Sequence, residues 1–299
     1  MSQPASRPSA KVDPVKAELL RLRSVGPQSA EMGKALTNKS PQIVALAAKM
    51  CAEAELSEMG PDLVRAFERF LGPKAPPDRG CYARTALAKA LTHLEIQAES
   101  LYRTGTQIYL PEYSGDDAAA ELRGYCAIGL ARTSRQALDI LLELLADPHP
   151  NTRALAATAI GEHGIHAGQY LLKLRLLSNE EHPHVIGECL AALLQMDPEG
   201  AVAFLEKHFL RSHPELAIDA LAQARQHQAL LRIYPDHLKD LLPALAMTGH
   251  SEAVQFLLEL VKNAPASESQ LAAKSLQDLR PDSQTQEKIA DALSQRTSR

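Results

Sequence analysis

A short phrase of small residues closed by an aliphatic residue or Met recurs along the chain. Clear copies end at Leu91, Leu130, Ile160, Leu193, Leu221, Met247 and Leu276, and a looser copy ends at Met50. The steps between the clear copies are 39, 30, 33, 28, 26 and 29 residues. A period in this range is typical of stacked helical pairs, because one pair cannot bury its apolar face alone. The sequence therefore predicts an all-α chain built from repeated helical hairpins.

Composition narrows the classes of function. The formal net charge is −4 with a pI near 6.3, whereas a domain that binds nucleic acid in general is strongly basic, so a nucleic-acid partner is not expected. No stretch has the roughly 18 consecutive apolar residues of a membrane span, and the first residues carry no apolar signal segment. The four Cys form no C-x-x-C pair, which argues against a zinc site or a disulfide framework. We expect a cytoplasmic chain without membrane contact.

The positions of Pro indicate where the second helices of the pairs begin. Pro recurs just before the second helix of successive pairs, as at Pro150, Pro183 and Pro214, where it suits the first helical turn. We expect a disordered tail over 1–12 and one continuous domain over 13–299, with about seven or eight hairpins and a C-terminal capping helix.

The rhythm breaks once, in an irregular insertion near 95–117. Five of the seven tyrosines lie between positions 82 and 125, in and around this segment. Long loops inside compact domains are often functional, and Tyr is favoured at recognition surfaces because it joins an apolar face to a polar tip. Tyrosines also pin long loops onto their own domain, so the sequence leaves a structural and a recognition role open.

The turn and helix phrases resemble the HEAT-type α-solenoid class. The most regular copy joins the turn Asp147–Arg153 to the helix Ala156–Gly161, and the resemblance covers roughly 28–280. Shorter phrases around Cys81, Cys126 and Cys189 look like those of bacterial HEAT-repeat proteins of unassigned function. The resemblance implies a right-handed α–α superhelix, related to armadillo-type solenoids. It also implies a scaffold or adaptor that holds a protein partner along a concave face lined by the second helices.

Charged residues and histidines are the candidates for ion pairs and metal sites. Arg123 lies six residues after Asp117, and Arg153 lies six after Asp147, a spacing that would staple a turn to the next helix. Five histidines fall between 149 and 184, but Gly and Pro separate them, so they are not held on one helical face. Solvated turn residues are the default interpretation for them, and no metal or cofactor is expected.

Related solenoid enzymes depend on residues that this chain lacks. It contains no His-Glu dipeptide of the HEAT-like hydroxylases, no Trp of the alkylpurine glycosylases and neither a phosphate-binding loop nor a nucleophile elbow. We therefore expect a non-catalytic protein-binding scaffold that uses the concave face and the insertion. The alternative is a nucleic-acid-binding or small-ligand, enzyme-like HEAT solenoid of a lyase or DNA-repair type. The candidate binding residues are Tyr82, Arg84, Tyr102, Tyr109, Tyr113, Glu121, Arg123 and Tyr125.

Overall fold

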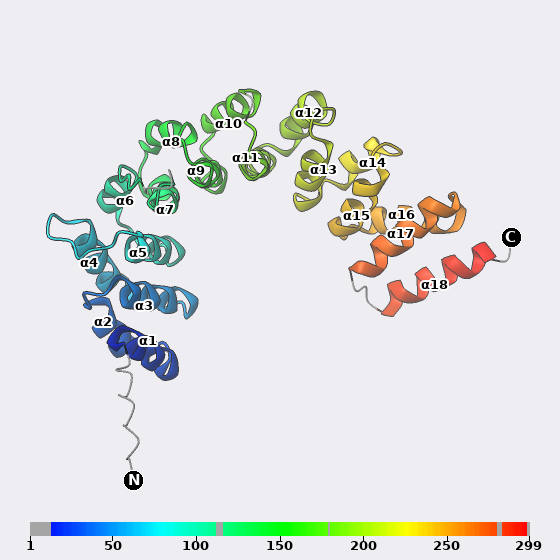
Figure 1. The fold of residues 1–299 in the computed structure, drawn as a ribbon. Coiled ribbons are helices and arrows are strands. Elements are labelled where there is room, and N and C mark those ends of the chain that lie inside the picture. The colour runs from blue at the N-terminus through cyan, green and yellow to red at the C-terminus, as the bar shows by residue number, and fades with distance from the viewer. Residues whose placement is uncertain (1–12, 112–115, 179, 280–282, 298–299) are drawn as a thin grey trace, which may run out of the picture. The chain divides into compact units, whose positions relative to one another are not determined.

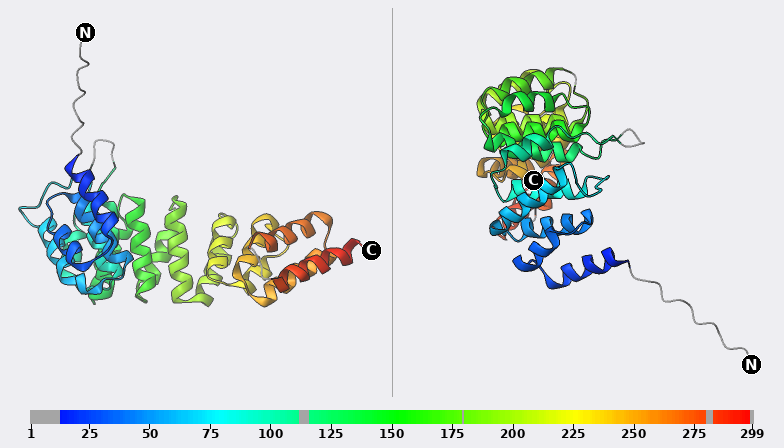
Figure 2. Two further views of the ribbon diagram at one scale, coloured as in Figure 1. Left: turned by 90° about the horizontal axis from the view of Figure 1, so that it is seen from below. Right: turned by 90° about the vertical axis from the view of Figure 1, so that its left-hand side faces the viewer.

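The computed structural model describes residues 13–111, 116–178, 180–279 and 283–297. Within these ranges the chain forms 18 α-helices and one short 3₁₀ helix, with an isolated bridge between Pro111 and Asp117 in place of any strand (Figure 1). Both views of Figure 2 likewise show coiled ribbons and no arrows over the described residues. The predicted all-α class is confirmed for this part of the chain. The helices form two compact units that divide between Ala159 and Ile160.

The N-terminal unit holds the first helices in chain order. They are α1 (Pro14–Val25), α2 (Ser29–Leu36), α3 (Pro41–Glu53), η1 (Ser57–Met59), α4 (Gly60–Leu71), α5 (Tyr82–His93), α6 (Glu99–Gly105), α7 (Ala120–Thr133), α8 (Ala137–Leu145) and most of α9 (Pro150–Glu162). Pairs form between α2 and α3, α4 and α5, and α6 and α7. The second helices α3, α5 and α7 pack in one row, and α2, α4 and α6 form a second row beside it (Figure 1).

The C-terminal unit repeats this packing. Its helices after α9 are α10 (Gly168–Leu177), α11 (Pro183–Met196), α12 (Pro198–His208), α13 (Pro214–Gln223), α14 (His227–Ile233), α15 (Leu238–Thr248), α16 (Ser251–Asn263), α17 (Ala266–Asp278) and α18 (Ser283–Thr297). Here α11, α13, α15 and α17 pack in succession, while α10, α14 and α16 each pack on the second helix that follows. The predicted terminal helix is α18, which packs on α16 and α17.

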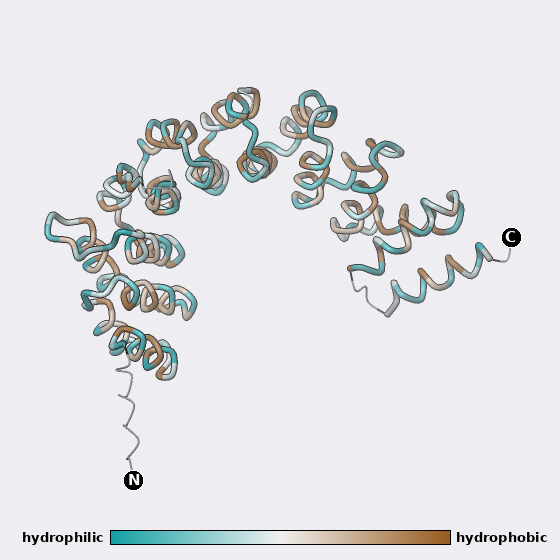
Figure 3. The backbone as a smooth tube through the Cα atoms, in the orientation of Figure 1, coloured by the Kyte–Doolittle hydropathy of each residue, from teal (hydrophilic) through white to brown (hydrophobic). Residues whose placement is uncertain are grey.

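Local sequence explains where the helices start and which face they bury. Pro stands in the first turn of α3, α11, α12 and α13, where its missing N–H leaves no helical hydrogen bond unmade. Helix α4 buries Leu63, Ala66, Phe67 and Phe70, residues spaced three and four apart along one face. Figure 3 shows the same alternation of apolar and polar residues along individual helices.

The irregular insertion is shorter than the sequence predicts. Helix α6 occupies Glu99–Gly105 and packs on α7, so the third pair keeps the two-helix pattern. Sequence periodicity does not predict α6. The helix has only seven residues and buries only Tyr102 and Gly105, so its apolar residues do not recur often enough to show a helical period. The irregular part runs from 106 to 119, and its residues 112–115 lie outside the described ranges.

Close contact between α6 and α7 depends on a glycine. The fully buried Tyr102 ring of α6 lies against Gly129 of α7, and a Cβ added there would stand 2.5 Å from the ring atoms Cε1 and Cζ. Real carbon atoms do not approach so closely, so any side chain at this position would displace the ring. Gly129 therefore sets how near the two helices of this pair can lie.

Replacing Gly129 by Ala tests this contact. We expect Gly129→Ala to lower the free energy of unfolding by about 1–3 kcal/mol, because the methyl group overpacks the Tyr102 ring. Gly187→Ala is the matched control: Gly187 also lies inside a helix, α11, but its added Cβ meets nothing within 4 Å. There the change should be neutral or stabilising by up to about 1 kcal/mol. Urea denaturation followed by circular dichroism measures both, and equal midpoints would contradict the assigned contact.

Candidate partner-binding surface of the N-terminal unit

A buried arginine anchors the irregular segment to the helices. The Arg123 side chain, from the first turn of α7, is only 1% exposed. Its Nε and Nη2 atoms donate to Oδ2 and Oδ1 of Asp147 at 2.9 and 3.0 Å. Its Nη1 atom donates to Asp117 Oδ2 at 2.5 Å and to the Ile108 carbonyl at 2.9 Å. One guanidinium thus joins the 106–119 segment to the turn before α9.

The irregular segment is also closed on itself. Asp117 Oδ1 accepts hydrogen bonds from the backbone N–H of Leu110 and of Ala119, at 2.8 and 3.0 Å. The Ala118 N–H donates to the Leu110 carbonyl at 3.1 Å. The Tyr109 ring lies on the guanidinium of Arg123, with 4.0 Å between the ring centroid and Cζ. Tyr109 is nevertheless 55% exposed, so the network holds an aromatic ring at the surface.

Charge in this network is balanced by pairing. Burial alone would raise the pKa of Asp117, but the two N–H donors and Arg123 outweigh it and hold the pKa below its ordinary value. Burial likewise opposes the charged form of Arg123, but Asp147 and Asp117 outweigh it and raise the pKa of the guanidinium. Asp117 and Arg123 therefore remain ionised and bound to each other at neutral pH.

The Asp–Arg spacing of six residues serves as a staple at three turns. Arg123 meets the Asp117 carboxylate, as the sequence predicts, and Arg153 Nη1 donates to the Asp147 carbonyl at 2.9 Å. A third copy, which was not predicted above, joins Arg84 to Asp78. The Arg84 Nε atom lies 3.3 Å from Asp78 Oδ2, and Arg84 Nη2 donates to the Asp78 carbonyl. The signal that could have found it was the same spacing.

Three of the candidate binding residues are occupied within the fold. Tyr102 is fully buried and donates its hydroxyl to the Ile96 carbonyl at 2.9 Å, and this burial raises its pKa to about 12. Arg123 is buried in the network above, and Arg84 is held by Asp78. For these residues the structure favours the packing role that the sequence left open. Tyr113 lies outside the described residues.

The other candidates lie on or near one exposed stripe. Tyr82 on α5 is 61% exposed, and Glu121 on α7 is also exposed. Tyr125, one turn after Glu121, is half-buried, and the Lys89 ammonium of α5 lies 5.0 Å from its ring centroid. A side-chain hydrogen bond with Tyr125 raises the pKa of Lys89. We call Tyr82, Lys89, Glu121 and Tyr125 the α5–α7 stripe.

Comparison with known proteins adds no family: no family model matches the chain, and no curated protein matches it. None of the helices in the described ranges combines the length and apolar character needed to cross a membrane. The candidate surface is therefore argued from its own geometry.

Replacing Arg123 should remove its ion pairs with Asp117 and Asp147 and destabilise the fold. We expect Arg123→Met to cost about 3–5 kcal/mol of stability, because it leaves the Asp147 carboxylate buried without its cation. Arg103→Met is the control, since Arg103 pairs at the surface with the exposed Glu99 and should contribute only about 0–1 kcal/mol. Thermal and urea unfolding of the two variants measure the difference, and comparable losses would contradict a structural role for Arg123.

The Asp117 carboxylate should make this part of the fold acid-sensitive. Its lowered pKa means that it stabilises the folded state above the unfolded-state pKa of about 3.9, and that this stabilisation is lost as the pH falls through the lower folded-state value. At pH 7 we expect Asp117→Asn to be less stable than the wild type by about 1–3 kcal/mol. The gap should narrow as the pH falls below about 4. Urea denaturation at pH values from 7 to 3 checks it, and a gap independent of pH would rule out the carboxylate as its source.

Proposed function

We propose that this chain is a non-catalytic, HEAT-type α-solenoid that acts as a protein-binding scaffold or adaptor. Two features support the repeat assignment: second helices pack in succession within each unit, and the turn phrase around Asp147 recurs as an Asp–Arg staple. The right-handed superhelix and the concave binding face belong to this proposal. In repeat proteins of this kind, the second helices line an extended surface that takes a partner.

The observation that carries the proposal is the exposed α5–α7 stripe. On α5 a set of residues that are not fully buried follows helical spacing, from Tyr82 through Thr85 and Ala86 to Lys89. On α7 only Glu121 and Tyr125 of the first two turns escape full burial. Since α5 and α7 pack side by side, two aromatic rings and two opposite charges share the exposed faces of neighbouring second helices.

The chemistry of this stripe favours a protein partner over a nucleic acid. The stripe carries one positive side chain, Lys89, and one negative side chain, Glu121, whereas a groove that binds nucleic acid carries clustered Lys and Arg. Tyr is enriched at protein interfaces, where a few aromatic anchors supply most of the binding energy. Tyr109 adds an exposed ring that Arg123 already holds in place, so less side-chain entropy would be lost on binding.

The remaining parts of the proposal concern chemistry and location. All four cysteines are buried thiols, and burial raises the pKa of Cys51 to about 11. Thiols of this kind behave as small apolar residues rather than as nucleophiles. Cysteines that stay reduced as thiols suit a reducing compartment, which supports a cytoplasmic location. We assign no catalytic residue and no catalytic cofactor to the chain.

Capture from a host-cell lysate tests the proposal. We expect the immobilised wild type to retain a specific protein, and Tyr82→Ala/Tyr109→Ala to weaken its recovery about tenfold or more, since an aromatic anchor contributes about 2 kcal/mol. Tyr170→Ala is the matched control, because Tyr170 is 68% exposed but lies on α10 in the other unit. Melting curves show that each variant is folded.

Two outcomes would contradict this assignment. If the folded double variant recovers as much of the captured protein as the wild type does, the binding site does not include Tyr82 and Tyr109. Retention of nucleic acid instead of protein, checked with labelled DNA and RNA oligonucleotides at physiological salt, would favour the enzyme-like or nucleic-acid alternative.

A further inference from the structure

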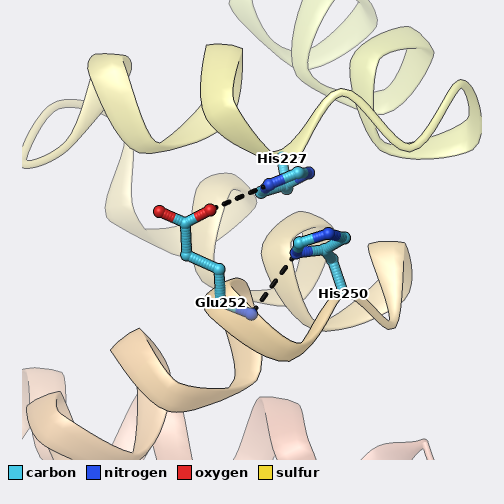
Figure 4. Close-up of side chains that lie close together, drawn as sticks. All are labelled: His227, His250 and Glu252. Atoms are coloured by element: carbon cyan, nitrogen blue, oxygen red, sulfur yellow. Dashed lines mark hydrogen bonds and ion pairs between the residues drawn. The ribbon is translucent and has the colours of Figure 1, made fainter.

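Two histidines and one glutamate meet in the C-terminal unit, far along the chain from the candidate binding residues. His227 is the first residue of α14, His250 caps α16, and Glu252 lies in the first turn of α16. Each of the three offers one ligand atom, and these atoms lie within 4.8 Å of one another (Figure 4). The cluster joins the starts of two helices that pack together.

The side chains are already arranged by their own interactions. The two imidazole rings stack with centroids 3.5 Å apart and planes 11° from parallel. His227 Nε2 lies 3.1 Å from Glu252 Oε2, and His250 Nδ1 accepts the backbone N–H of Glu252 at 3.3 Å (Figure 4). These contacts hold the three side chains together at the starts of α14 and α16.

We propose that His227, His250 and Glu252 bind one divalent transition-metal ion, with zinc as the physiological candidate. Two imidazole nitrogens and one carboxylate oxygen make a donor set that suits zinc, and three protein ligands leave a fourth position for water. His250 and Glu252 are exposed, so the ion has direct access from solvent. The bound ion would clip the turn before α14 to the turn before α16 and stabilise this unit.

Small rearrangements bring the ligand atoms to bonding distance. In a tetrahedral shell with zinc–nitrogen bonds of about 2.0 Å, ligand atoms stand about 3.3 Å apart, so these need to close by about 1.5 Å at most. Imidazole lone pairs lie in the ring plane, so one stacked ring has to rotate about χ2 for both to converge. That torsion is broad in histidine, and the Glu252 side chain is 58% exposed, so solvent-side space is open to it. At His250 the ion takes the Nδ1 lone pair in place of the Glu252 N–H; binding at Nε2 instead requires the ring proton to move to Nδ1, which breaks the same hydrogen bond.

Calorimetric titration of the full chain with zinc chloride tests the site, with cobalt chloride as a coloured probe of tetrahedral coordination. The test variant is His227→Gln/His250→Asn, because Asn preserves the cap of α16 while removing the imidazole. The control is His182→Ala/His184→Ala, which also removes two histidines but from the start of α11. Glu252→Gln removes the carboxylate alone.

We expect the wild type and the control to bind one zinc ion per chain, and the two site variants to bind about tenfold more weakly or worse. Saturating zinc should also raise the wild-type melting temperature by about 5 °C and leave that of His227→Gln/His250→Asn unchanged. The proposal is overturned if the wild type takes up no stoichiometric zinc, or if the folded site variants bind as tightly as the control. Either result leaves the proposed protein-binding surface untouched, since that surface lies in the other unit.

Discussion

The fold depends on a packing constraint: each helical pair buries its apolar face only against the next pair. In the N-terminal unit this contact runs through α3, α5 and α7, whose shared faces consist largely of Ala, Leu and Gly. Small residues let the backbones approach, and the same limit applies within the third pair, where the Tyr102 ring of α6 fills the space that a Cβ on Gly129 of α7 would need. Because each pair makes this close contact, the run of small residues that ends in an aliphatic residue recurs once per pair in the sequence.

Charged staples add what apolar packing leaves undetermined, namely the path of the chain between helices. Asp147 illustrates this, because its carboxylate binds Arg123 of α7 while its carbonyl accepts a hydrogen bond from Arg153 of α9. One residue therefore ties two successive second helices of the N-terminal unit to the turn between them. Burying the guanidinium is tolerable only because two carboxylates and a carbonyl take its donors.

The sequence predicts the helices well where local rules decide them, as at the Pro-marked starts and the amphipathic face of α4. It failed at α6, whose seven residues carry no period, and it placed the irregular insertion too early as a result. The Asp117–Arg123 staple could be predicted because its partners are close in sequence. The Asp147–Arg123 pair could not, since 24 residues separate them and only tertiary packing brings them together.

The candidate site shows why composition alone cannot separate recognition from packing. The sequence gathers tyrosines in one region, and the structure assigns them different environments: Tyr102 is buried as a wedge, whereas Tyr82 and Tyr109 remain on the surface. Burial depends on which helix face each ring occupies and on what opposes it, and the opposing residue at Tyr102 is a glycine 27 positions further along. The exposed Tyr109 ring is held by Arg123, which itself stays inside the fold. A ring held in this way is already ordered, so it loses less side-chain entropy on contact with a partner, and this suits the proposed protein-binding face.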